Sequence, residues 1–418
     1  MQPLTTIFLL FVTASVITRL WLSIRQVNHI GAHYEKVPGD FADKISLKDH
    51  QKAADYSCTK IRFGRIDIFW ETLWLFIWTL GGGIDFVDQW WAGFNLATLS
   101  HGIAVIISLT IISSILNLPF SLYQTFVIEE RFGFNKTNLK TWVQDLLKTT
   151  ALMLVLGIPL LASILWLMNQ AGDQWWVYAW LLWMGFTFVM IWAYPAFIAP
   201  IFNKFSSLDN ESLRSRIEGL LQRCGFQSQG VYVVDGSRRS SHGNAYFSGF
   251  GKNKRIVFYD TLLESLSEDE VEAVLAHELG HFKRNHIKKS LLLSSVMSLA
   301  GFALLAWFMR SDWFFYSLGV DTVGTHTALL LFIMVMPVFT YFINPLFSSL
   351  SRKHEFEADE FAYFNSDYKA LISALVNMYR DNASTLTPDP IHSIFYDSHP
   401  PASIRINHLK TIAANNPG

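Results

Sequence analysis

The sequence predicts an all-α polytopic membrane protein that carries a small α+β domain. Three observations lead to this fold class. Of the 418 residues, 51% are hydrophobic and only 16% are charged, whereas charged residues make up roughly 25% of an average soluble domain. The mean hydropathy is +0.26. Long apolar segments recur along the chain, and only two stretches outside them are long enough to form a soluble domain.

Seven apolar segments approach the ~20 residues that a helix needs to cross the hydrocarbon core of a bilayer. They are residues 4–24, 66–86, 102–124, 149–169, 175–195, 289–309 and 327–347. The second segment contains Asp67 and Glu71, which lie four residues apart and therefore on one helical face. Such groups face either an aqueous interior or the membrane interface, and the pattern leaves both interpretations open.

The distribution of lysine and arginine predicts the orientation. The loops after the first and third segments are rich in both residues, and the loops after the second and fourth contain neither. The positive-inside rule then places the C-terminus in the cytoplasm. The expected organisation is five spans within 1–195, a cytoplasmic part over 196–288, two spans within 289–347 and a second cytoplasmic part over 348–418. A net charge of −1 argues against a nucleic-acid partner.

The first polar part mixes helix and strand signals. Apolar residues from Leu213 to Cys224 recur at helical spacing, and Gly225 follows as a stop signal. Ser267 and Glu270 have the spacing of a capping box, which opens a second helix. Three short stretches rich in β-branched and aromatic residues predict the strands of a small sheet, at 230–236, 244–249 and 254–260.

The helix opened by this capping box contains the sequence His277-Glu278-x-x-His281. Residues four apart lie on the same helical face, so both imidazoles can point at one metal ion. Glu278 lies about 100° further round the helix and flanks that ion. This is the spacing of a zinc metalloprotease helix with glutamate as the general base. Taken alone, the motif also fits a surface helix with solvated histidines.

A third metal ligand is expected from the second polar part, because catalytic zinc takes three protein ligands and leaves one position for water. Glu355 and Asp359 follow the last apolar segment and share one helical face. One could bind zinc while the other accepts a hydrogen bond from the far nitrogen of a ligand histidine. The spacing does not decide which, and a solvated charge cluster is the alternative.

Further along, a helix is expected over about 368–380, then a loop with Pro388 and Pro390, then a helix start at the Pro-Pro pair that follows His399. Arg405 lies about two turns beyond His399. The oxyanion of a tetrahedral intermediate needs hydrogen-bond donors, and three residues are candidates, although each taken singly fits a structural role better: His399, Arg405 and Asn244.

Five sequence stretches resemble the type I CAAX prenyl proteases, a family of integral-membrane zinc metalloproteases. They are LAHELGH (275–281), EFEAD (355–359), HGNAYFSGFGKNKRIVFYDTLL (242–263), SHPPASIRI (398–406) and YQTFVIEERFGFNKT (123–137). These stretches occur in both polar parts and among the apolar segments, so the resemblance covers nearly the full chain.

The resemblance implies a gluzincin metallopeptidase site that binds one Zn²⁺ per chain. His277, His281 and Glu355 would be the ligands and Glu278 the general base. Asp359 would support a ligand, and the scissile carbonyl would lie near Asn244, His399 and Arg405. The family further implies seven transmembrane helices that enclose a chamber, and removal of the last three residues from prenylated proteins or peptides.

Two departures from the eukaryotic members favour a compact member in a bacterial inner membrane rather than the endoplasmic reticulum. The C-terminus, AANNPG, contains no obvious retrieval signal, and the stretch between the last two apolar segments is short. Two other functions stay open. One is membrane-protein quality control, as in the HtpX proteases that share these motifs. The other is a membrane scaffold or transporter with a structural zinc, for which His286 or His354 would be a fourth ligand.

Overall fold

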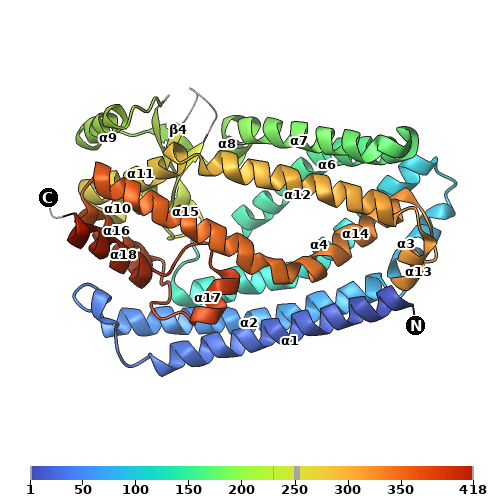
Figure 1. The fold of residues 1–418 in the computed structure, drawn as a ribbon, viewed down its shortest axis with the longest axis horizontal. Helices are drawn as coiled ribbons and strands as arrows, with labels where there is room; N and C mark the ends of the chain where they lie inside the picture. Colours follow the sequence, from blue (N-terminus) through green and yellow to red (C-terminus); the bar gives the residue numbers. More distant parts are fainter. Residues whose placement is uncertain (1, 229, 249–254, 417–418) are drawn as a thin grey trace.

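The computed structural model describes residues 2–228, 230–248 and 255–416. Long helices run along the molecule, and a small sheet with shorter helices closes one end (Figure 1). The long helices are α1 (Pro3–Ala32), α2 (Leu47–Trp78), α4 (Thr98–Tyr123), α6 (Leu139–Gln170), α7 (Trp175–Ala193), α12 (His286–Phe308), α14 (Thr325–Thr340) and α15 (Asn344–Asn365).

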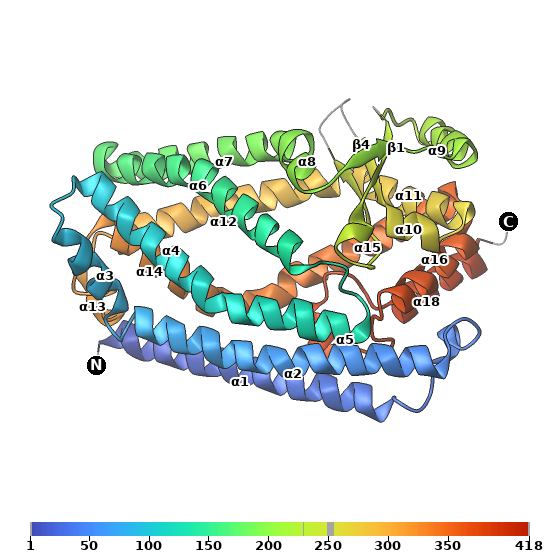
Figure 2. The ribbon, with the colours of Figure 1, turned by 180° about the vertical axis from the view of Figure 1, so that it is seen from behind.

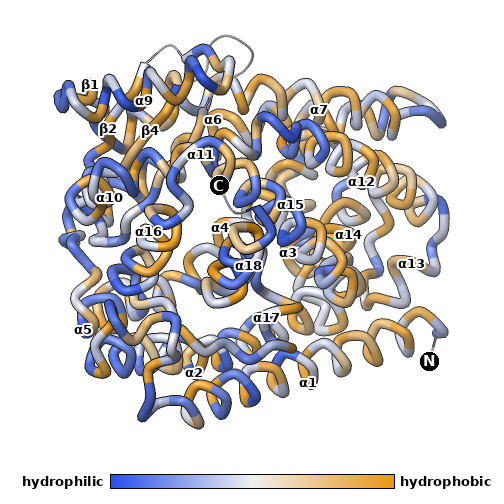
Figure 3. Tube along the Cα trace, turned by 60° about the vertical axis from the view of Figure 1, so that its left-hand side comes forward, coloured by the Kyte–Doolittle hydropathy of each residue, from blue (hydrophilic) through white to orange (hydrophobic). Residues whose placement is uncertain are grey.

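Six helical segments among the described residues are long and apolar enough to cross a membrane. They contain α1, α4, α6, α7, α12 and α14, several of them extended by adjoining helical turns. Coloured by hydropathy, α7 and α12 are largely hydrophobic, whereas hydrophilic residues gather around α9 and α10 at the opposite end (Figure 3). This confirms the multi-pass membrane architecture.

The predicted second span, residues 66–86, is not one helix. α2 ends at Trp78, and α3 (Gly83–Ala92) begins after a turn in which Gly82 has φ +75°. α2 is not among the six apolar segments, because charged residues interrupt its C-terminal half. Two of these charged residues contact α1, which runs beside α2 (Figures 1 and 2): Arg65 donates to Ser23 Oγ at 2.7 Å, and Glu71 forms an ion pair with Arg19 at 2.9 Å. A count of seven spans is therefore not confirmed.

A cavity of about 580 Å³ lies between α1, α2, α4 and α14. Its lining includes Arg19, Glu71 and Asn117, together with tryptophan and aliphatic side chains. Glu71 therefore lines this cavity with a side chain that is 60% exposed.

The sheet contains four strands, and its core packs on helices from both polar parts of the chain. β2 and β4 are parallel and the other pairs antiparallel. The three predicted strands are confirmed over 231–234, 245–248 and 255–259, and the predicted residues 249 and 254 lie outside the described residues. β1 is only three residues long and has no recognisable pattern. The strand order is β1 (Phe205–Ser207), β2 (Val231–Val234), β4 (Arg255–Tyr259) and β3 (Ala245–Ser248).

The helices of this end follow the expected signals. Gly225, with φ +63°, comes just after the end of α9, and the Ser267–Glu270 capping box opens α11. The predicted helices near 368–380 and after Pro401 are α16 and α18. The remaining bounds are α5 (Glu130–Phe132), α8 (Ala199–Phe202), α9 (Glu211–Arg223), α10 (Asp260–Ser265), α11 (Glu268–Lys283), α13 (Asp312–Ser317), α16 (Tyr368–Asp381), α17 (Pro390–Tyr396) and α18 (Ala402–Asn415).

The loop expected around Pro388 and Pro390 is wrong in part, because Pro390 begins the short helix α17. Asp389 caps this helix by accepting hydrogen bonds from the backbone N–H groups of Ile391 and His392, at 3.1 and 3.0 Å. The same carboxylate accepts two hydrogen bonds from Arg25 on α1, at 3.2 and 2.8 Å. Proline at the first helical position needs no N–H partner, so a capped start here is stable.

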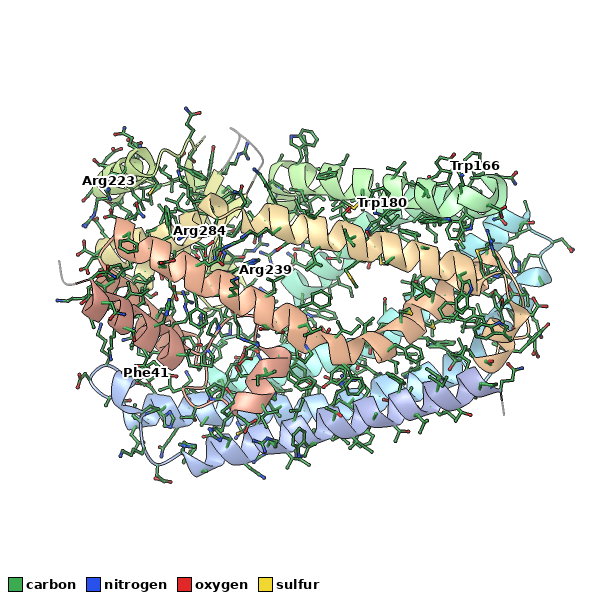
Figure 4. All side chains as sticks on the ribbon, in the orientation of Figure 1. Phe41, Trp166, Trp180, Arg223, Arg239 and Arg284 are labelled. Carbon is green, nitrogen blue, oxygen red and sulfur yellow. The ribbon has the colours of Figure 1, made fainter. Side chains whose placement is uncertain are left out.

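Arg239 connects the sheet to the long helices (Figure 4). Its guanidinium donates to both carboxylate oxygens of Asp145 on α6, at 2.7 and 3.0 Å, and to the backbone carbonyl of Phe202, at 2.7 Å. The backbone N–H of Lys136 donates in turn to the Arg239 carbonyl, at 3.1 Å. The end of the stretch 123–137 therefore lies against the loop that follows β2.

Candidate metal centre

α11 and α15 together form a cluster of two imidazoles and one carboxylate. The Nε2 atoms of His277 and His281 lie 3.2 Å apart. Glu355 places Oε2 3.4 Å from the first and Oε1 3.3 Å from the second. His277 and Glu355 are buried, and His281 is partly exposed. Three ligand atoms of types that zinc prefers thus converge on one point from two separate segments.

The close packing of α11 and α15 depends on Gly280, which lies between His277 and His281 in the sequence. A Cβ atom built there would be 2.9 Å from the Ala358 Cα atom and 3.0 Å from its carbonyl oxygen. Both contacts are with backbone, so a side chain could be accepted only if α15 moved away. The glycine of the HELGH sequence therefore sets the distance between the histidines and Glu355.

Replacing Gly280 with alanine is expected to lower peptidase activity by about 10²-fold, because a displacement near 1 Å at reacting groups has that order of effect. The loss should be accompanied by weaker zinc binding. Gly301→Ala on α12 is the matched control, since its added Cβ would meet nothing within 4 Å. Wild-type zinc affinity and activity in Gly280→Ala would contradict this account of the helix packing.

The far nitrogens of both histidines are also engaged. His277 Nδ1 lies 2.8 Å from Asp359 Oδ1, and Arg405 donates to both oxygens of that carboxylate, at 2.6 and 2.9 Å. His281 Nδ1 lies 3.0 Å from Nδ1 of His286. Because the Nδ1 atoms contact Asp359 and His286, the Nε2 atoms of both histidines are free to bind a metal ion.

His286 was considered in the sequence only as a fourth ligand, and the structure gives it a different position. Its Nε2 lies 2.9 Å from Glu357 Oε2, and its ring stacks on His354 at 4.0 Å between centroids. Neither of these two histidines joins the three-ligand cluster among the described residues. His286 is only five residues from His281 in the sequence, and this proximity could have predicted that the two imidazoles contact each other.

The cluster fits a zinc ion. Glu355 Oε2 is buried and has no hydrogen bond of good geometry among the described residues, although His399 Nδ1 and Arg405 Nη1 lie 2.9 and 3.6 Å from it. A buried carboxylate oxygen without a hydrogen bond is costly, and a metal ion would satisfy it. Within the described ranges the cluster offers three protein ligands and no fourth, which is the set of a catalytic rather than a structural zinc site.

The other predicted catalytic residues differ in how near they lie. Glu278 is half-buried beside His277 and has no hydrogen-bond or ion-pair partner within the described ranges. His399 is 65% exposed and borders Glu355 on the open side. Arg405 is buried behind His277, where it donates to Asp359 and places Nη1 3.6 Å from Glu355 Oε2. Asn244 is exposed before β3, and its Oδ1 accepts from the Ala245 N–H; no hydrogen bond among the described residues joins it to the cluster.

Zinc binding by the metal-free protein is expected to release about one proton at pH 7.5. Burial and Arg405 lower the pKa of His277, but Asp359 and Glu355 outweigh them and raise it to about 9. The imidazole is therefore expected to be protonated at pH 7.5, and its Nε2 proton must pass to the buffer before that nitrogen can bind a metal ion. Zinc affinity should fall about tenfold per unit between pH 8.5 and 7. The measurement is calorimetric titration with zinc in two buffers of different ionisation enthalpy, because a released proton is taken up by the buffer. Equal heats of binding in the two buffers would contradict the release of a proton.

Two protein-family models match the chain, one after the other. The first, described as CAAX prenyl protease N-terminal, five membrane helices, matches residues 26–204. The second, described as Peptidase family M48, matches residues 207–413. The second match contains the whole His277, His281 and Glu355 cluster.

Relatives of known name match over nearly their whole length. An Arabidopsis thaliana protein named CAAX prenyl protease 1 homolog is 34% identical, over 96% of this chain and 96% of its own. A Homo sapiens protein of the same name is 32% identical, over 90% and 89%. The crystal structure of Ste24p from S. mikatae superimposes with a TM-score of 0.89 and 30% identity, over 98% of this chain and 99% of that chain.

Proposed function

Because this chain belongs to the CAAX prenyl proteases of peptidase family M48, we propose that it removes C-terminal tripeptides from prenylated CAAX proteins or peptides. It is a multi-pass membrane protein and a zinc-dependent metalloprotease. The observation that carries the proposal is the cluster of His277, His281 and Glu355 at the end of a membrane bundle that encloses a cavity.

We assign the metal to those three residues and the proton transfers to Glu278. Bound zinc supplies a Lewis acid that polarises the scissile carbonyl and acidifies a water molecule. The Glu278 carboxylate accepts the proton of the attacking water and delivers it to the leaving amine. Its half-buried position, with no ion pair to any residue that the structure describes, supports this role, since an ion-paired carboxylate would be a poorer base.

Asp359 and Arg405 are proposed as positioning residues. Asp359 accepts the Nδ1 proton of His277 and so fixes the tautomer that leaves Nε2 free. Arg405 balances the buried charge of Asp359. His399 is exposed beside Glu355 and is the better placed of the three proposed donors to the oxyanion.

The substrate peptide is proposed to bind as an extra strand along β3. Among the described residues β3 pairs with β4 only, which leaves its outer edge to accept an extended peptide. Phe247 of β3 packs on Phe282 of α11 at 4.9 Å between ring centroids. A peptide on this edge would therefore run beside the helix that contains His277 and Glu278, and Asn244 would contact its backbone.

We further propose that the catalytic end is cytoplasmic, which the distribution of lysine and arginine supports. The division into parts at 1–195, 196–288, 289–347 and 348–418 belongs to this proposal. A bacterial inner membrane stays a prediction, since the relatives named above come from eukaryotes.

The substrate is tested with a farnesylated CAAX peptide and the same peptide without the lipid. Purified protein is expected to release the tripeptide from the farnesylated form at least about tenfold faster, because each buried CH₂ group contributes about 0.8 kcal/mol of binding. Equal rates, with cleavage of unfolded membrane proteins, would instead support the quality-control function of the HtpX type. Added chelator should stop the reaction in either case.

A further inference from the structure

A second cluster of two imidazoles and one carboxylate lies at the other end of the molecule. Asp88 is on α3, His101 on α4 and His326 on α14. Both histidines place Nε2 2.7 Å from the same oxygen, Oδ1 of Asp88, and the three ligand atoms lie within 4.8 Å of one another. α3 occupies the end opposite α10, α16 and α18, so this cluster is far from the catalytic residues (Figure 1).

Packing holds the cluster in place independently of its own hydrogen bonds. Asp88 and His326 are buried, at 6% and 8% exposure. Gly102 and Gly324 pack closely against His326. A Cβ atom added at Gly102 would lie 2.9 Å from the His326 Cβ atom, and one added at Gly324 would lie 3.2 Å from its Cε1 atom. One turn before Asp88, Asp85 accepts hydrogen bonds from two backbone N–H groups of the loop before α14, at 2.9 and 3.0 Å.

We propose that Asp88, His101 and His326 form a second divalent-cation site, of the type that binds zinc. Two imidazole nitrogens and one carboxylate oxygen are ligands that zinc prefers. The set matches the first cluster in residue types and in burial, with two buried members and one partly exposed. Nothing in the catalytic reaction uses these residues, which lie on α3 and at the N-terminal turns of α4 and α14.

The geometry needs a small adjustment to accept an ion. Ligand atoms around a tetrahedral zinc with bonds near 2.0–2.1 Å are about 3.3 Å apart, as they are in the first cluster. Here the 2.7 Å separations are hydrogen bonds, so the two imidazoles must withdraw by roughly half an ångström and carry their protons on Nδ1. His101 can move, since its side chain is 16% exposed.

The consequence of ion binding would be structural. The three ligands come from α3 and from the N-terminal turns of α4 and α14, so one ion would hold three chain segments together. With three ligands among the described residues, water would complete the coordination. Removing this ion should lower thermal stability and leave peptide cleavage intact.

The test measures zinc per chain by mass spectrometry, after metal stripping, reloading with zinc alone and removal of the excess. Wild type should hold two ions, His101→Gln one with cleavage retained, and His277→Ala one with cleavage lost. The double variant should hold none. His33→Gln, an exposed histidine outside both clusters, should keep two. If His101→Gln fails to fold, Asp88→Asn takes its place, because asparagine has the size of aspartate and keeps one hydrogen-bond acceptor.

One ion in wild type and none in His277→Ala would overturn the second site and leave the catalytic proposal standing. One ion that is lost in His101→Gln but kept in His277→Ala would support the second site and overturn the proposed catalytic ligands. An unchanged melting temperature on zinc addition to His277→Ala would also contradict the structural role.

Discussion

Replacing Glu278 with glutamine is expected to lower kcat for peptide hydrolysis by about 10³-fold, within the range that a general base contributes. The amide has nearly the same shape but cannot accept the proton of the attacking water. Zinc content should not change, because Glu278 lies beside the ligand cluster and is not part of it. The measurements are steady-state cleavage of a CAAX peptide and zinc per chain.

Glu272→Gln on the same helix is the matched control for this prediction. Glu272 forms ion pairs with Arg216 and Arg223 of α9, at 3.1 and 2.7 Å, so its charge supports packing and not chemistry. The Glu272→Gln variant should cleave the peptide at close to the wild-type rate. Hydrolysis at the wild-type rate by Glu278→Gln would exclude glutamate as the base, and loss of zinc would assign it to the metal ligands instead.

Replacing Arg405 with methionine is expected to destabilise the protein by about 3–5 kcal/mol, the usual cost of leaving one member of a buried ion pair alone. Asp359 is fully buried, and both of its oxygens accept hydrogen bonds from Arg405. Zinc affinity should fall by about 10–100-fold, as it does when a group that supports a ligand histidine is disturbed. Thermal unfolding and zinc titration measure the two effects separately.

Two further variants distinguish positioning from bulk stability. Arg405→Met combined with Asp359→Leu removes both charges, so stability should return while zinc affinity stays low, because His277 Nδ1 has lost its acceptor. Arg284→Met is the control, since Arg284, at the end of α11, pairs with Glu360 of α15 at 3.2 Å, with both side chains nearly half exposed. Exposed pairs contribute about 0–1 kcal/mol. Recovery of both stability and zinc affinity in the double variant would contradict the positioning role.

Features that depend on residues near one another in the sequence could be predicted from the sequence. The i, i+4 spacing fixes His277 and His281 on one helical face, and the Ser267–Glu270 cap fixes where that helix begins. The apolar segments and the stop at Gly225 are local in the same sense. The resemblance to the family also named Glu355 as the third ligand, and the structure places it opposite both histidines.

Features that depend on contacts between distant segments needed the tertiary structure. Spacing alone could not separate Glu355 from Asp359, because both lie on one face of α15. The contact of Gly280 with Ala358 sets the register, so Glu355 meets the Nε2 atoms and Asp359 meets Nδ1 of His277. Likewise, Asp359, the partner of Arg405, lies 46 residues away in the sequence, and no local sequence pattern predicts a contact over that separation.

The sequence by itself therefore determined a membrane protein with a two-histidine helix, since hydropathy and helical periodicity act within about 20 residues. Tertiary structure decided which carboxylate faces the histidines, what holds each ring from behind, and that α2 directs Glu71 to Arg19 and is not a simple apolar span. It also brought Asp88, His101 and His326 together from three helices. Such groupings arise only when packed helices meet, because their members are distant along the chain.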